Sequence, residues 1–212
     1  MLYIYALAAD LGGIADLRGV CGEGLQLVPV GAGVAVAGSI DAMPAVDAGT
    51  LKAQDALVRV LHERAAALLP MRFGTAMIDA TAAVEAINAR EGIAEKLEKV
   101  RGCEQMIVRV AGEVSAAPAP DVTHASGRAY LEARARVHAA TPELSAIARA
   151  AGPLARDVRI ESAQQPGLMG SVYHLIARGR GDEYRAAIET AAAAHPGVRV
   201  RITGPFPAYA FA

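Results

Sequence analysis

The sequence predicts an α+β fold with two domains, an N-terminal α+β domain over residues 1–102 and a C-terminal domain over residues 103–212. Short apolar runs bounded by Gly, Pro and Asp are typical of strands, and they alternate with longer segments whose apolar residues recur every three or four positions, as in amphipathic helices. A Gly at position 102 separates two sets of such elements. We therefore place the domain boundary near this glycine.

The N-terminal domain is expected to begin with a buried strand over residues 2–8, which ends at the Asp- and Gly-containing turn 10–13. Two further short strands at 25–30 and 33–39 flank the glycines of segment 31–33. Such a pair of strands around a Gly turn predicts a β-hairpin.

An amphipathic helix is predicted to start at Thr50, as its N-cap, and to continue until Pro70 stops the pattern. Gln54 is the one polar member of its apolar stripe, whose other residues are Leu51, Val58, Leu61, Ala65 and Leu68. The face that carries this stripe is expected to pack on the strands.

A second helix is expected to begin at Asp79 or Thr81, either of which can act as its N-cap. Gly92 interrupts the apolar pattern and Gly102 ends it. The N-terminal domain is thus expected to combine strands with two helical segments.

The C-terminal domain has the element order βαββαβ, which is the ferredoxin-like order. Asp182 is the predicted N-cap of the second helix, and the Pro- and Ala-rich stretch 115–120 is a predicted exposed, mobile loop. Pro142 either starts a new helix or kinks a continuous one. The expected elements are a strand at 105–111, a helix at 126–151, strands at 155–162 and 168–178, a helix at 182–194 and a strand at 198–203.

Composition argues against several classes of function. The chain has 21 Lys and Arg against 22 Asp and Glu, a formal net charge of −1, so no nucleic-acid or anionic-membrane partner is expected. No apolar run approaches the ~20 residues that span a bilayer. The first residues lack the basic region and cleavage site of a secretory signal, which predicts a cytoplasmic protein.

Chemistry-bearing motifs are absent from the sequence. Cys21 and Cys103 lie in no CxxC pair, so both are expected to be reduced, structural thiols. No two of the five His stand at the i, i+4 spacing of a helical metal pair, and there is no GxSxG, GxGxxG or phosphate-loop motif. We therefore expect no metal, no cofactor and no catalytic residue.

Three segments instead combine aromatic residues with Arg, Pro and Gly: 69–75, 127–134 and 203–211. In the first, Arg72 should lie in a strand with its side chain opposite those of Met71 and Phe73, and it either pairs with a carboxylate that fixes the two domains or contacts a partner. In the second, Tyr130 and Arg134 share one helix face, where packing is the simpler role.

The third of these segments is the C-terminal tail. Pro205 and Pro207 favour a stiff, extended backbone after the last strand, which would present Phe206 to a partner. The alternative is that Phe206, Tyr209 and Phe211 fold back and complete the protein's own core. The sequence leaves both open.

Together, in this order, these motifs resemble the GvpF/GvpL family of gas vesicle proteins. The resemblance rests on the opening Tyr-containing strand, LPxRFG at 69–74, the Gly-Cys-Glu joint at 102–104, GxxYLxxR at 127–134 and TGPxPxY at 203–209. The chain departs from the family pattern in having Gln54 where a His is usual, Phe206 where a Trp is usual, and a short connector near Pro118 and Pro120.

The resemblance implies a cytoplasmic, vesicle-associated assembly factor that is not an enzyme and needs no cofactor. Its implied partners are the hydrophobic gas vesicle shell subunit and other minor gas vesicle proteins. The residues expected to contact a partner are Arg72, Phe73, Tyr130, Arg134, Pro205, Phe206, Pro207, Tyr209 and Phe211. A diverged ferredoxin-like enzyme acting on a small molecule and an oligomeric scaffold are the alternative functions.

Overall fold

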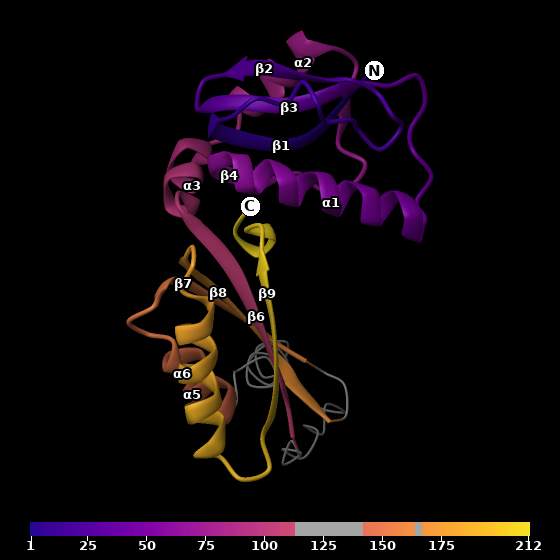
Figure 1. Ribbon diagram of the computed structural model, residues 1–212. Coiled ribbons are helices and arrows are strands. Elements are labelled where there is room, and N and C mark those ends of the chain that lie inside the picture. The colour runs from indigo at the N-terminus through magenta and orange to yellow at the C-terminus, as the bar shows by residue number, and fades with distance from the viewer. Residues whose placement is uncertain (113–141, 164–166) are drawn as a thin grey trace, which may run out of the picture. The chain divides into compact units, whose positions relative to one another are not determined.

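The computed structural model describes residues 1–112, 142–163 and 167–212, which form two compact units of mixed helices and strands (Figure 1). Unit 1 comprises Met1–Gln105 together with Phe206–Ala212, and unit 2 comprises Met106–Pro205. The fold is α+β, as the sequence predicts. The last residues, which we expected in the C-terminal domain, group with unit 1. The domain boundary near residue 102 stays a prediction.

The sheet of unit 1 has strand order β2-β3-β1-β4, with β5 also paired to β1. The central strand β1 (Leu2–Leu11) pairs antiparallel with β3 (Gly33–Ser39) on one side, and with β4 (Ala65–Pro70) and the short β5 (Ala76–Met77) on the other. At the edge, β2 (Leu25–Val30) forms with β3 the hairpin that the sequence predicted.

Strand β4 corrects the prediction of one long helix up to Pro70. The helix, α1 (Ala48–Arg64), ends at Arg64, and the next six residues pair with β1. Their Ala- and Leu-rich sequence has a high helix propensity. Pairing with a central strand buries these residues on both faces and outweighs that local preference. Accordingly, the residues after Pro70 do not form the strand that we expected around Arg72.

The start of α1 also differs from the prediction, because Asp47 and not Thr50 is its N-cap. The Asp47 carboxylate accepts hydrogen bonds from the backbone N–H groups of Gly49 and Thr50 at 2.7 and 2.9 Å, and the Thr50 side chain completes a capping box. The second helical segment is divided at Gly92, which has φ 75°, and Asp79 caps its first part. These two helices are α2 (Ala80–Asn88) and α3 (Ile93–Val100).

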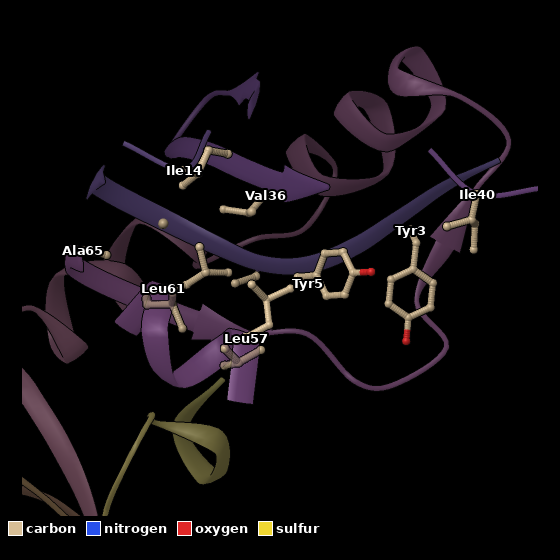
Figure 2. Close-up of a cluster of buried hydrophobic side chains, with 12 residues drawn as sticks. Tyr3, Tyr5, Ile14, Val36, Ile40, Leu57, Leu61 and Ala65 are labelled. Carbon is tan, nitrogen blue, oxygen red and sulfur yellow. The ribbon is translucent and has the colours of Figure 1, made fainter. Parts of the chain in front are cut away.

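The core of unit 1 depends on a β-bulge in β1. The pairing with β3 shifts by one residue between positions 4 and 6, so Tyr3 and Tyr5 lie on the same face as Ala6 instead of alternating with it. Both Tyr side chains are fully buried, and in Figure 2 the Tyr5 ring lies beside Leu57 and Leu61 of α1 while the Tyr3 ring lies between Tyr5 and Ile40. The bulge thus directs two large rings and the small residues after them toward one helix.

Unit 2 has a sheet of order β7-β8-β6-β9, with α5 and α6 on the same side of it (Figure 1). Its elements, in chain order, are β6 (Cys103–Ala111), α5 (Pro142–Ala150), β7 (Ala155–Ser162), β8 (Leu168–Ala177), α6 (Gly181–Ala193) and β9 (Arg199–Phe206). Side chains from both helices and all the inner strands form one apolar cluster between the layers.

Two predictions for unit 2 were wrong in detail. The N-cap of α6 is Arg180, and Asp182 lies in the first turn, where its charge still favours the helix dipole. Strand β9 continues through Pro205 to Phe206, beyond the predicted end at residue 203. The predicted loop 115–120, the first part of the helix expected at 126–151 and the link between residues 141 and 142 lie outside the described residues.

A fully buried His174 connects β8 to both helices of unit 2. Its Nδ1 lies 2.7 Å from the hydroxyl of Tyr184 on α6, and its Nε2 lies 2.9 Å from the carbonyl oxygen of Ala148 on α5. Because a carbonyl oxygen can only accept, Nε2 carries the proton and Nδ1 accepts from Tyr184. Burial lowers the pKa of His174, so the ring is neutral in the folded protein.

We expect acid to destabilise unit 2 through His174. Below the ordinary pKa of 6.5, His174 of the unfolded chain binds a proton that the folded protein does not take up. The free energy of unfolding is therefore full above pH 6.5 and falls as the pH drops toward the pKa of the folded state. The loss is at most about 1.4 kcal/mol per pH unit. In the variant His174→Gln, the new side chain still offers a hydrogen-bond acceptor and a donor, but it has no group that titrates. Thermal unfolding at pH 7.5 and 5.5 should show a smaller loss in this variant, and an equal loss would contradict the assignment.

Candidate functional site

The residues after β4 form a turn beside the central strand β1 of unit 1. Met71 donates its backbone N–H to the carbonyl oxygen of Tyr5 at 2.9 Å, and Ile4 donates to the carbonyl oxygen of Thr75 at 2.9 Å. Between these two bonds the chain leaves the edge of β1 and returns to it as β5. We call residues 71–75 the LPxRFG turn.

A buried polar network holds this turn. Gly74 donates its backbone N–H to the hydroxyl of Tyr3 at 2.8 Å, and Tyr3 donates its proton to Oε1 of Gln54 at 2.6 Å. Gln54 in turn donates from Nε2 to the carbonyl oxygen of Met71 at 3.3 Å. A strand, a helix and both ends of the turn are therefore joined through one hydroxyl and one amide.

The environment keeps this network in a single protonation state. Burial raises the pKa of Tyr3, and the bond from the Gly74 N–H opposes this only in part. The hydroxyl therefore stays protonated at neutral pH and remains available as a donor to Gln54. Gly74 has φ 85°, a conformation that favours glycine, and this places its N–H toward Tyr3.

The LPxRFG turn presents its two candidate residues differently. Phe73 is half-buried, and its ring meets that of Tyr3 edge to face with the centroids 6.1 Å apart. Arg72 is exposed, and its guanidinium makes no ion pair with any described residue. The carboxylate partner considered for Arg72 is thus not found among those residues, and a role in partner contact stays a prediction.

The C-terminal tail folds onto α1 within unit 1. The hydroxyl of Tyr209 donates to Oδ1 of Asp55 at 2.8 Å, and the guanidinium carbon of Arg59 lies 4.7 Å from the centroid of the Phe206 ring. Asp55 also accepts from Arg59 at 2.7 Å. One i, i+4 pair on α1 therefore engages both rings of the tail.

The remainder of the tail is buried. Phe211 is 1% exposed, and Pro207 and Ala208 are buried beside it. The backbone N–H of Ala210 donates to Oε1 of Gln105 at 2.7 Å. Of the two possibilities that the sequence left open, these contacts place Phe211 in the protein's own core, whereas Tyr209, 40% exposed, and Pro205 keep accessible surface.

Two of the candidate residues, Tyr130 and Arg134, lie outside the described residues. No group of three His, Cys, Asp or Glu side chains in the described part of the chain is arranged to hold a metal ion. Among residues 1–112, 142–163 and 167–212, no helix has the length and apolar character needed to cross a membrane. Cys21 is exposed and Cys103 is buried, and the two do not form a disulfide.

Sequence reasoning missed Tyr3 as the centre of the network and missed an exposed apolar surface on unit 1. The single polar residue in the stripe of α1, Gln54, was a signal that a buried partner existed. The apolar surface has no such signal, because its residues lie in connecting segments without periodicity. It consists of Met1, Met43, Val46 and Ile78, which we call the apolar end of unit 1.

Comparison with known proteins decides the family. The family model described as "Gas vesicle synthesis protein GvpL/GvpF" matches residues 1–212. The chain belongs to the GvpL/GvpF family. Membership gives it a role in gas vesicle formation and associates it with the gas vesicle.

Individual relatives of this GvpL/GvpF protein agree with the family match. Gas vesicle protein L of Streptomyces sp. (strain CB03234) is 28% identical over 251 aligned positions, which cover 99% of this chain and 92% of that protein. The crystal structure of GvpF from Microcystis aeruginosa has a TM-score of 0.74 at 13% identity, covering 99% of this chain and 98% of that one. The crystal structure of GvpF from Anabaena sp. PCC7120 has a TM-score of 0.73 at 14% identity, and the match covers 99% of this chain and 97% of that one. The likeness to the two GvpF structures shows a shared fold.

We expect the buried network to stabilise unit 1 as a coupled set. Tyr3→Phe and Gln54→Leu each leave buried polar groups without a partner, which costs about 1–3 kcal/mol. Because both substitutions break the same bond, the double variant should lose less than the sum of the two. Urea unfolding followed by circular dichroism measures these free energies.

The matched control for this cycle is Gln26→Leu, at an exposed glutamine on β2, which should change stability by no more than about 0.5 kcal/mol. Strict additivity of the Tyr3 and Gln54 substitutions would show that the two residues stabilise the protein independently.

Proposed function

We propose that this protein is a gas vesicle assembly factor that binds the hydrophobic shell subunit, together with other minor gas vesicle proteins, and has no catalytic activity. The observation that carries the proposal is the apolar end of unit 1. Val46 is 80% exposed, Ile78 81% and Met43 44%. Exposed apolar side chains mark a surface that meets another macromolecule when they lie next to one another in a patch.

Three of these residues, Met1, Met43 and Ile78, come from separate segments that the fold brings together. Met1 and Ile40 exchange backbone hydrogen bonds, and Leu2 pairs with Met77, so the N-terminus lies beside the segment that carries Ile78. The terminal carbon of Met43 lies 3.8 Å from the position that a Cβ at Gly74 would occupy. The apolar end therefore borders the LPxRFG turn, and the exposed Arg72 extends the same surface.

Such a surface suits a shell subunit. A subunit that polymerises into a wall with a water-repelling face aggregates if it is released free, because its apolar area and strand edges pair with one another. Reversible binding to apolar surface on a soluble carrier prevents this. Flexible Met side chains adapt to a partner of irregular shape.

The candidate residues from the sequence divide by their exposure. Arg72, Pro205 and Tyr209 are exposed and able to meet a partner, whereas the half-buried Phe73 and Phe206 contribute ring edges. The buried Pro207 and Phe211 act by fixing the tail on unit 1. Tyr130 and Arg134 remain proposed contacts on the basis of the family motif alone.

For unit 2 we propose a ferredoxin-like domain that starts near residue 103, after an N-terminal domain ending at 102. The described elements follow one another as βαββαβ, and numbering its strands 1 to 4 gives the sheet order 2-3-1-4. Both features support the ferredoxin-like assignment.

The apolar end is tested by removing its side chains. Met43→Ser, Val46→Ser and Ile78→Ser combined should reduce the shell subunit retained in a pull-down several-fold, because central apolar anchors supply most of the energy of such interfaces. The helix caps Asp47 and Asp79 are left intact.

The control substitutes Val158 and Ile160 of unit 2, which are 42% and 40% exposed, with Ser. This variant should retain the subunit as the parent does. Equal retention by all three proteins, or an equal loss in both variants, would refute the assignment of binding to the apolar end.

The tail is tested separately. Phe206→Ala with Tyr209→Ala should weaken retention of the shell subunit if the rings meet it directly. The control is Asp55→Ala with Arg59→Ala, which removes the internal partners of the tail and keeps its rings. Unchanged retention in the double Ala variant would exclude the tail from the binding surface, and equal losses in both variants would show that tail docking alone matters.

A further inference from the structure

Charge is segregated along this chain, although its net value is close to zero. Residues 106–205 contain 12 Arg, no Lys and 9 Asp or Glu, a net charge of +3, whereas the remainder contains 9 Lys or Arg and 13 Asp or Glu, a net charge of −4. The exclusive use of Arg matters, because the guanidinium binds carboxylates in a bidentate manner and Lys does not.

Some of these arginines gather on one face of the unit 2 sheet. Met106, Val108 and Val110 of β6 belong to the apolar cluster under the helices, and so do Val200 and Ile202 of β9. Because side chains alternate along a strand, the residues between them lie on the opposite face. That face therefore carries Arg109 on β6 and Arg199 and Arg201 on β9.

The three arginines lie close to one another. Strands β6 and β9 are neighbours in the sheet. A Cβ at Gly112 would lie 2.9 Å from the carbonyl oxygen of Gly197, so the end of β6 lies against the residues just before β9. All three side chains are exposed, and none forms an ion pair with a residue in the described part of the chain. We call them the arginine row.

Like charges on adjacent strands oppose sheet formation, and one carboxylate on this face, that of Glu161, already accepts a hydrogen bond. Glu161 on β7 accepts a hydrogen bond from the hydroxyl of Tyr173 on β8 at 2.8 Å. Arg109 lies near enough to Tyr173 to lower its pKa slightly, against the larger rise from burial and Glu161. The three arginines of the row therefore repel one another, and no ion pair with a described residue neutralises their charge.

We propose that the arginine row is a docking surface for an acidic, extended segment of a partner protein. Arg199 and Arg201 are two residues apart on one strand, about 6.6 Å along its axis. An extended peptide with carboxylates at alternate positions has the same spacing and can pair with both. Glu161 on the same face disfavours a continuous phosphate backbone, and the net charge of the whole chain is only −1, so a peptide fits this surface better than a nucleic acid.

This proposal is independent of shell-subunit binding at the apolar end. The two surfaces lie on different units and differ in chemistry, one apolar and one cationic. Their tests therefore use different probes and different variants.

The probe is a fluorescent peptide of alternating Glu and Ser, and its binding to the full chain is followed by anisotropy in low and high salt. The parent should bind it, with affinity that falls as salt rises. A triple variant with Arg109→Gln, Arg199→Gln and Arg201→Gln should bind the peptide roughly tenfold more weakly or worse, because it loses three exposed ion pairs of modest strength. The same peptide with Gln for Glu should not bind.

The matched control is Arg90→Gln, Lys96→Gln and Arg149→Gln, which removes the same charge from exposed positions elsewhere. It should bind the peptide within about twofold of the parent, because it leaves the three arginines of the row in place. Equal weakening in both triple variants, no binding by the parent, or equally tight binding of a single-stranded oligonucleotide of the same charge would each overturn the proposal. Circular dichroism melts confirm that all variants are folded.

Discussion

The hydroxyl of Tyr3 is the group on which the arrangement of unit 1 most depends. It accepts from the turn at Gly74 and donates to Gln54 on α1, while its ring fills the core beside Tyr5. One side chain therefore fixes the distance between a central strand, the helix that covers it and the LPxRFG turn. Because the turn borders the apolar end, the network also positions the surface through which we propose that the protein acts.

The same network explains how a departure from the family pattern is tolerated. Where the family usually has a His, this chain has Gln54, which accepts from Tyr3 and donates to the carbonyl oxygen of Met71. A neutral imidazole has one acceptor and one donor nitrogen and can serve the same two groups. Gln and neutral His are thus two residue types that can make the same pair of hydrogen bonds.

The chain returns to unit 1 at its end, and this fixes what the tail can do. Strand β9 lies in the sheet of unit 2, while Phe206 at its end and Tyr209 contact Arg59 and Asp55 of α1, and Phe211 is buried. Most of the aromatic surface that the sequence suggested for a partner is therefore used internally. Two exposed surfaces of the described residues, the apolar end and the arginine row, suit partners of different chemistry.

Local patterns predicted the elements that local chemistry determines. The β2–β3 hairpin follows from the glycines around its turn, and the break between α2 and α3 from the positive φ of Gly92. Strand β4 was missed because residues 65–70 favour a helix unless β1 pairs with them. The apolar end was beyond prediction, and the sequence left open whether the tail docks on its own core, since both features arise from contacts between segments distant in sequence. The βαββαβ order of unit 2, by contrast, follows from its own periodicity.

Hydrogen exchange, measured by mass spectrometry with and without the gas vesicle shell subunit, tests the central claim most directly. If the protein carries the subunit on the apolar end, peptides covering residues 40–47 and 74–79 become protected in the complex, and those covering β7 do not. Protection confined to other regions, or none despite stable complex formation, would contradict this account.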